Sequence, residues 1–139
     1  MLRDSQVRTT LPALDLERAK RFWGETLGLE IVLDRPDGVV FRAGQPEGAA
    51  KVGWSDSVTF LVFPSPNPAR GGHTQMGFRV DDIDGAVAEL RAAGVALEEY
   101  DTPATKTVEG IASIAGGHGK GAWFKDSEGN LIGIVQLDF

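Results

Sequence analysis

Three side chains that can exchange protons or bind anions occur within one stretch of the sequence, "DTPATKTVEGIASIAGGHGKG", residues 101–121. They are Lys106, Glu109 and His118. Because imidazole titrates near neutral pH and a carboxylate can accept a proton, His118 and Glu109 are the candidates for a general acid or base. The alternative for His118, as for the second histidine, His73, is a solvated loop position without a chemical role.

The stretch that carries these residues is too long for a simple hairpin loop. Long connections with several glycines are often lids that close over a ligand, or chemically silent mobile segments. We expect residues 103–121 to be the most mobile internal part of the chain and to border a ligand site. The glycines between 116 and 121 are the expected hinge.

Four aromatic side chains are candidates for stacking on a planar ligand: Phe41, Trp54, Phe60 and Trp123. Aromatic rings commonly line small-molecule pockets. The alternative is the hydrophobic core, and we expect about half of the four to be core residues. Trp23 belongs to a helical pattern and is expected to pack against a sheet.

The pattern that predicts the elements carrying these side chains occurs twice in the sequence. Asp15 precedes apolar residues at helical spacing, and Gly28 follows the last of them. Asp82 and Gly94 enclose a second such pattern, about half the chain length further on. Aspartate is a good helix N-cap and glycine a good helix terminator, so the sequence predicts two similar helices in an internal duplication.

Each predicted helix is preceded by one β-rich segment and followed by three. The segments are residues 7–11, 31–33, 39–43 and 58–63 in the first half and 76–80, 97–100, 122–125 and 131–136 in the second. Glycine in "RPDG", residues 35–38, and in "DSEGN", residues 126–130, favours antiparallel hairpins.

These patterns predict an α+β fold with two βαβββ modules in one domain, residues 1–139. Module one is expected at 1–66 and module two at 73–139. The proline-rich residues 63–72 are the expected linker between them, because proline interrupts both helices and strands.

Composition excludes several functional classes. The chain of 139 residues has no cysteine, which excludes thiol chemistry and agrees with a reducing cytoplasm. Its net charge is −6 and its basic residues are scattered, so nucleic acid is not an expected partner. The N-terminus has no apolar signal region and no apolar run could span a bilayer, so we expect a soluble, cytoplasmic protein without a membrane partner.

Nearly the whole chain resembles the vicinal oxygen chelate superfamily, which includes glyoxalase, bleomycin-resistance proteins, fosfomycin-resistance enzymes and extradiol dioxygenases. The resemblance is carried by "LDLERAKRFWGETLGLEI", "FRVDDIDGAVAELRAAGV" and "AWFKDSEGNLIGIVQ". The hairpin D-x-x-G-N-x-I after a "WF" strand is its most specific part. The resemblance implies that eight strands form an open cleft.

Metal-binding members of the superfamily carry one ligand on the first strand and one on the last strand of each module. The matching positions here are Arg8, a residue within 59–63, Gln75 and Gly133. Arg8 is a permanent cation, Gly133 has no side chain, and the run 59–63 contains no acid. The resemblance therefore predicts that no metal is bound, and we expect no other cofactor.

At those positions Arg8 and Gln75 are expected to face the cleft and to bind an anion or a carbonyl, with Lys106 and the aromatic residues as further ligand contacts. A structural ion pair is the alternative for Arg8. The leading hypothesis is a cytoplasmic homodimer that binds a small organic molecule without metal, as in the bleomycin-resistance branch. The alternative is a glyoxalase-like lyase, isomerase or dioxygenase with an atypical site that uses His118 or Glu109, and whether any reaction is catalysed stays open.

Overall fold

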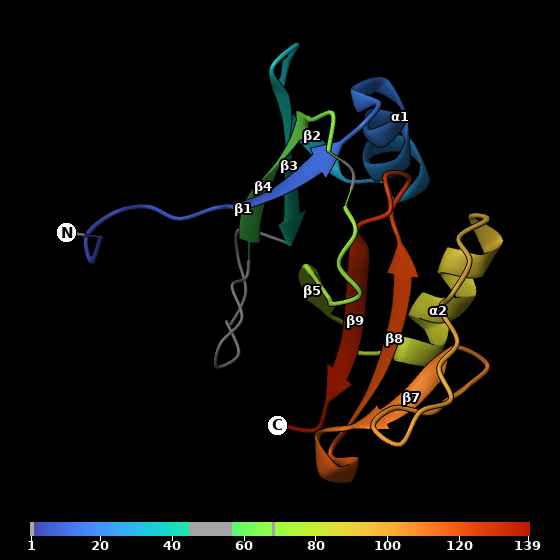
Figure 1. Ribbon diagram of the computed structural model, residues 1–139. Coiled ribbons are helices and arrows are strands. Elements are labelled where there is room, and N and C mark those ends of the chain that lie inside the picture. Colours follow the sequence, from blue (N-terminus) through green and yellow to red (C-terminus); the bar gives the residue numbers. More distant parts are fainter. Residues whose placement is uncertain (1, 45–56, 68) are drawn as a thin grey trace. The chain divides into compact units, whose positions relative to one another are not determined.

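The computed structural model describes residues 2–44, 57–67 and 69–139, and it divides the chain into two compact units. Unit 1 is Met1–Pro68 and unit 2 is Ala69–Phe139 (Figure 1). Each unit contains one β-sheet and one main helical segment, so the predicted α+β class is confirmed. Among the described residues, no helix has the length and apolar character needed to cross a membrane.

Unit 1 contains a four-stranded sheet in the order β1-β4-β3-β2. Its strands are β1 (Thr9–Ala13), β2 (Glu30–Arg35), β3 (Gly38–Gly44) and β4 (Ser57–Pro64). β1 runs parallel to β4 and the other pairs are antiparallel. The helix α1 (Leu16–Lys20) continues as a π-helical segment, η1 (Arg21–Thr26), and α1 packs on β3 and β4.

The core of unit 1 lies between this helical segment and the sheet. Trp23 of η1 is fully buried, and its ring centroid lies 4.9 Å from that of Phe60 on β4. Phe41 on β3 pairs with Phe60 across the strands, and their rings stack with centroids 5.6 Å apart. Alternate residues of a strand face opposite sides, so the same face of the sheet also presents other buried residues. These are Leu11, Ala13, Val39 and Val62.

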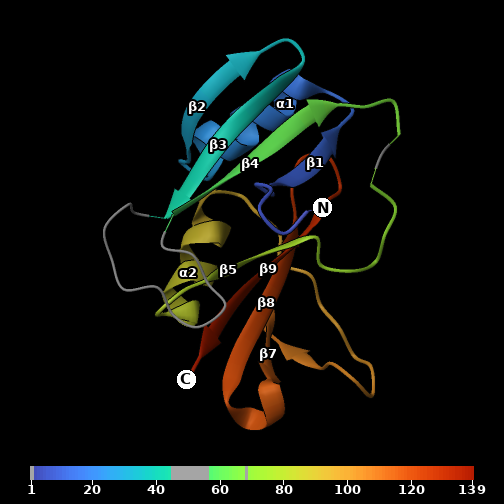
Figure 2. The same cartoon turned by 90° about the vertical axis from the view of Figure 1, so that its left-hand side faces the viewer.

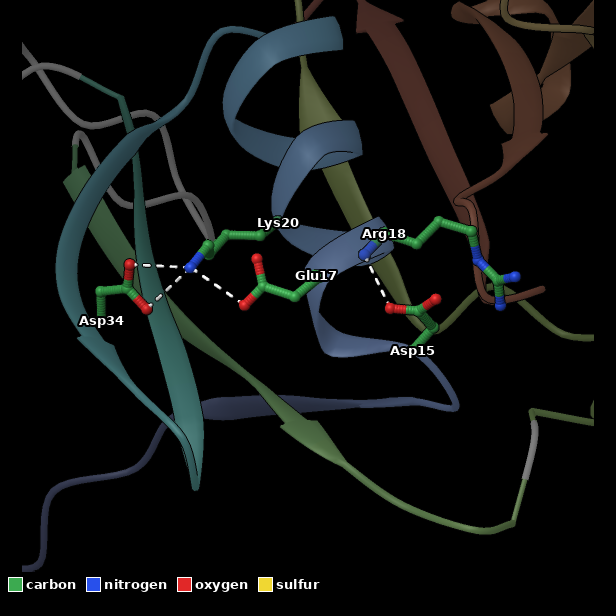
Figure 3. Close-up of polar contacts among 5 residues, drawn as sticks. All are labelled: Asp15, Glu17, Arg18, Lys20 and Asp34. Carbon is green, nitrogen blue, oxygen red and sulfur yellow. Dashed lines mark hydrogen bonds and ion pairs between the residues drawn. The ribbon is translucent and has the colours of Figure 1, made fainter.

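Polar contacts fix the start of α1 and tie it to the sheet (Figure 3). The side chain of Asp15 accepts a hydrogen bond from the Arg18 N–H at 3.0 Å, which confirms the predicted N-cap. Lys20 Nζ lies 2.9 Å from Asp34 Oδ2 on β2 and 3.2 Å from Glu17 Oε1. Hydrogen bonds to Asp34 and then to Glu17 raise the pKa of Lys20 above its ordinary value.

Unit 2 contains a five-stranded sheet in the order β5-β9-β8-β7-β6 (Figure 2). Its strands are β5 (Met76–Arg79), β6 (Thr107–Val108), β7 (Ile111–Ile114), β8 (Gly119–Lys125) and β9 (Leu131–Leu137). The helix α2 (Ile83–Ala92) begins after the predicted cap Asp82, which accepts from the Gly85 N–H at 3.1 Å. Ile83 and Val87 of α2 are buried, and α2 packs on β8 and β9.

The two sheets share strand order and direction, which confirms the predicted repeat of a βαβββ module. β5 runs parallel to β9 as β1 runs parallel to β4, and the remaining pairs are antiparallel in both. The first paired residues are Thr9 with Phe60 in unit 1 and Met76 with Ile132 in unit 2. Gly28 and Gly94 both have positive φ, +71° and +83°, as expected for residues that end helices.

The expectation of a long loop at 101–121 is wrong, because this segment forms strands. β6 and β7 make a hairpin closed by Glu109 and Gly110, with φ of 51° and 81°. β7 then connects to β8 through a short 3₁₀ segment, η2 (Ala115–Gly117). The predicted strand at 97–100 is reduced to one bridge between Leu97 and Phe124, and β7 takes its place in the repeat.

Both predicted hairpins are confirmed. β2 and β3 pair from Arg35 to Gly38, and β8 and β9 pair up to the turn at 126–130. In the second turn the buried carboxylate of Asp126 accepts from the backbone N–H of Glu128 at 2.9 Å and of Asn130 at 2.8 Å. It also accepts from Asn130 Nδ2 at 2.7 Å, so one carboxylate organises the turn.

Candidate functional site

The face of the unit 2 sheet opposite α2 carries a cluster of aromatic and polar side chains around Trp123. On β8, Phe124 is buried toward α2, so its neighbour Trp123 points to the other face. Trp123 pairs with Gly133 of β9. On its other side the Glu98 N–H donates to the Trp123 carbonyl at 2.7 Å, which places Glu98 directly opposite Trp123.

The Trp123 indole is held by contacts along its Nε1 edge. Nε1 donates to Thr74 Oγ1 at 3.1 Å. A Cβ atom on Gly121 would lie 3.1 Å from Trp123 Cη2, and one on Gly133 would lie 3.4 Å from Nε1. The indole therefore lies over two glycines, where a larger residue would displace it. The Tyr100 ring meets it at right angles, with centroids 5.6 Å apart and an interplanar angle of 81°.

A cavity of about 260 Å³ opens beside these rings, and we call it the Trp123 pocket. It is lined by Gly72, His73, Thr74, Tyr100, Thr102, Thr105, Trp123 and Leu131. The hydroxyl of Thr102 is engaged locally, because it accepts from the Thr105 N–H at 2.9 Å and donates to the Thr105 carbonyl at 3.1 Å. His73 and Tyr100 are the two titratable side chains of the lining.

Burial raises the pKa of Tyr100, and the nearby carboxylate of Glu98 raises it further. Both causes act in the same direction because each disfavours the phenolate. The phenol is therefore a neutral hydrogen-bond donor throughout the physiological pH range. Since the folded state holds this proton more tightly than the unfolded chain, stability falls only as pH rises through the window above about 10, the ordinary tyrosine value.

Tyr100 is the single tyrosine of the chain, so the absorbance of its phenolate reports this site alone. We expect an alkaline titration to give a pKa above the ordinary value, and we expect Glu98→Gln to lower it because one cause of the shift is removed. Glu99→Gln is the matched control. Glu99 is the next residue along the chain, and its carboxylate accepts a hydrogen bond from Thr107 Oγ1 at 2.5 Å. Equal effects of the two substitutions would contradict this assignment.

Of the four predicted aromatic contacts, Trp123 lines the pocket. Phe41 and Phe60 are 0% and 1% exposed in the core of unit 1, so they are core residues and the assignment of ligand contacts to them is corrected. The expectation that about half of the four aromatics would be core residues accounts for these two. Trp54 lies outside the described residues. Trp23 is a core residue, as predicted.

The structure does not bring the predicted acid–base candidates to Trp123. His118 follows η2, five residues along an extended strand from Trp123, which corresponds to about 17 Å. Glu109 lies in the β6–β7 turn, where its carbonyl accepts from Arg91 Nη2 of α2 at 2.8 Å. Lys106 is exposed, and its backbone pairs with that of Asp101 in an isolated β-bridge.

Arg8 and Gln75 occupy equivalent positions, directly before the first paired residue of β1 and of β5. Arg8 is exposed. Gln75 is bound to the start of β9: its Oε1 accepts from the Leu131 N–H at 3.2 Å, and its N–H donates to the Leu131 carbonyl at 2.9 Å. The Gln75 amide oxygen, the atom that a metal would need as its ligand, thus bonds to the sheet.

The donor set does not fit the metal of the metal-binding proteins that the sequence resembles. When the two sheets are compared strand by strand, Leu61 of β4 takes the position of Gly133 of β9. Neither residue has a metal-donor atom in its side chain. A Cβ on Gly133 would also lie 3.2 Å from Thr74 Cγ2, so this space is filled by Thr74 and Trp123. Across residues 2–44, 57–67 and 69–139, no three His, Cys, Asp or Glu side chains group as metal ligands would.

The sequence patterns missed three residues that line this site, His73, Thr74 and Tyr100, and Glu98 beside it. Thr74 directly precedes Gln75, the position matched to a metal ligand in the superfamily, and that resemblance could have pointed to it. Glu98 and Tyr100 share a face with Trp123 only because the chain at 97–98 pairs with the end of β8. A strand prediction that paired 97–100 with "AWFK" would have brought them together.

Comparisons with known proteins agree with this fold. The chain is similar to lactoylglutathione lyase from Agrobacterium tumefaciens, with 20% identity, a TM-score of 0.64, and coverage of 96% of this chain and 95% of that chain. Two Streptomyces sp. CB03234 proteins are also similar. TnmS3, an antibiotic binding protein, has 26% identity, a TM-score of 0.59 and coverage of 96% and 98%. A glyoxalase/bleomycin resistance protein has 28% identity, a TM-score of 0.54 and coverage of 90% and 94%.

No curated protein matches the chain. The sequence model of one family, the Glyoxalase/Bleomycin resistance protein/Dioxygenase superfamily, matches residues 5–134.

Proposed function

Because the chain belongs to the glyoxalase, bleomycin resistance protein and dioxygenase superfamily, whose members bind or transform small molecules, we propose that it binds a small organic molecule without a metal. The Trp123 pocket is the proposed site. The observation that carries the proposal is the Trp123 indole, fixed over Gly121 and Gly133 and joined by Tyr100 beside an open cavity.

The geometry of the pocket supports binding of a planar group. Two aromatic rings in edge contact form a corner, and a planar ligand that stacks on a ring face gains dispersion and quadrupole interactions. The cavity volume of about 260 Å³ lies near the lower end of the range for small-molecule sites. It suits a small ligand or one ring system of a larger ligand.

The similarity to TnmS3, an antibiotic binding protein, supports binding as the function. The positions of the acid–base candidates support it as well, because His118 and Glu109 lie away from Trp123. The proposal includes a cytoplasmic homodimer, as expected from the sequence.

One observation favours the alternative, a glyoxalase-like lyase, isomerase or dioxygenase. His73 lines the Trp123 pocket, and an imidazole beside a bound ligand can act as a general base. Turnover of a bound ligand that is lost in His73→Gln, while binding is kept, would establish this alternative.

The binding proposal is tested by titration with 2-naphthol, a small planar probe, followed through the NMR signal of the Trp123 indole N–H. We expect saturable shifts in the wild type and a loss of affinity of about tenfold or more in Trp123→Ala, because the stacking surface is removed. Trp123→Phe keeps a ring and should retain part of the affinity. His118→Gln is the distant control and should bind as the wild type does.

For the alanine variant, which lacks the reporting indole, affinity is read from saturation transfer to the probe. Unchanged affinity in Trp123→Ala would contradict the site. Native mass spectrometry of freshly purified protein reads metal content and oligomeric state together. A stoichiometric transition metal would contradict the metal-free proposal.

A further inference from the structure

Three groups on one face of the unit 2 sheet suggest the charge of the ligand: two rings that line the Trp123 pocket, and a carboxylate beside them that is not among the lining residues. The rings of Trp123 and Tyr100 stand at 81° to each other with their centroids 5.6 Å apart. The third group is the carboxylate of Glu98, whose backbone N–H bonds to the Trp123 carbonyl at 2.7 Å.

Glu98 belongs to the aromatic face of the sheet and not to the α2 face. Leu97 pairs with the buried Phe124 in a β-bridge. A Cβ on Gly110 would meet both Leu97 Cβ and Arg91 Nη2 of α2, so Leu97 lies on the α2 side. The alternation of a strand then turns Glu98 to the side of Trp123, and side chains directly opposite in antiparallel strands lie about 4.5–5.5 Å apart at Cβ. The raised pKa of Tyr100 has the Glu98 carboxylate as its second cause, which agrees with this placement.

Among the residues that the structure describes, no cation pairs with the carboxylate of Glu98. The adjacent Glu99 differs, because its carboxylate accepts a hydrogen bond from Thr107 Oγ1. Of the described residues that line the pocket, none is lysine or arginine, and His73 is the basic one.

We infer that the corner formed by Trp123, Tyr100 and Glu98 binds an organic cation, specifically the alkylated ammonium group of a small molecule. The inference rests on the proposed function and specifies the chemical class of its ligand.

The physical reason lies in the ring quadrupoles and the carboxylate. The face of an aromatic ring carries negative potential, and tryptophan attracts cations more strongly than the other aromatic residues. A methylated ammonium has a weakly bound hydration shell, so it loses little on leaving water and gains contact with both rings. A half-buried carboxylate without a cationic partner adds a Coulombic attraction that a neutral ligand cannot use.

The test compares choline with 3,3-dimethyl-1-butanol, its neutral isostere in which carbon replaces nitrogen. Both are titrated at pH 8, and binding is followed through the Trp123 indole N–H signal. We expect choline to bind about tenfold more tightly than the alcohol. Glu98→Gln should remove most of this preference, whereas Glu99→Gln should keep it.

Equal binding of the two probes would overturn the inference, and so would an absence of choline binding or a preference that survives in Glu98→Gln. These results are separable from failure of the proposed function. If 2-naphthol binds and depends on Trp123 while choline shows no preference, the pocket is a neutral aromatic site. If neither probe depends on Trp123, the proposed site itself is wrong.

Discussion

Replacing Trp23 by alanine is expected to lower the free energy of unfolding of unit 1 by about 3–5 kcal/mol. Trp23 is fully buried and joins the helical segment to the sheet. Its ring centroid lies 4.9 Å from that of Phe60 and 6.4 Å from that of Phe41. Its removal leaves a cavity that the stacked rings of Phe41 and Phe60 cannot fill, because their strands are paired.

The matched control is Phe22→Ala. Phe22 is the neighbour of Trp23 on η1. The two rings meet edge-on with centroids 5.7 Å apart, but Phe22 is only half-buried. We expect a clearly smaller loss for this variant. Denaturant unfolding gives the free energies, and hydrogen exchange of β3 and β4 amides assigns them to unit 1. Equal losses in the two variants would contradict the central role of Trp23.

Asp126→Ala is expected to destabilise unit 2 by at least about 3 kcal/mol. The carboxylate accepts hydrogen bonds from the backbone N–H groups of Glu128 and Asn130 and from Asn130 Nδ2. Asn130 is 0% exposed, so after the substitution water cannot take over these bonds without opening the turn. Each buried polar group left without a partner costs about 1–3 kcal/mol.

Two neighbouring substitutions make this prediction specific. Asp126→Asn keeps one acceptor oxygen and should cost less than Asp126→Ala. Ser127→Ala should be nearly neutral or slightly stabilising, because within the described residues its buried Oγ has no hydrogen-bond partner. Thermal unfolding of the three variants checks the order. A loss in Ser127→Ala as large as in Asp126→Ala would show that the turn is sensitive to any change.

The repeated module could be predicted from the sequence because its signals are local. Asp15 and Asp82 cap helices through side-chain oxygens, and Gly28 and Gly94 end them with positive φ. Each signal acts within one turn of chain, so the residue types alone reveal it.

The hairpin of β6 and β7 was missed because its turn has an unusual residue. Two-residue turns with positive φ at both positions favour Asn-Gly or Asp-Gly, whereas here Glu109 takes φ of 51° before Gly110. The segment also contains several glycines near its end, which resemble a hinge. The structure uses two of them, Gly119 and Gly121, in the ladder with β7.

The candidate site could be predicted only in part for the same physical reason. Trp123 stands beside a specific motif, but its partners Thr74 and Tyr100 approach it through strand register and tertiary packing. Phe41 and Phe60 could not be separated from Trp123 by residue type, since all three are aromatic residues in strands. Their burial depends on which face of the sheet the helix covers.

The close fit between Gly133 and Trp123 also constrains how the sequence can evolve. Any side chain at position 133 would start 3.4 Å from the indole nitrogen and 3.2 Å from the Thr74 methyl. A carboxylate at position 133 would therefore need the Thr74 methyl and the indole to shift by a few tenths of an ångström, so it and a tryptophan at position 123 disfavour one another. Among homologues with this hairpin, the two residues should be anticorrelated, and a shift between metal chemistry and aromatic recognition should favour paired substitutions.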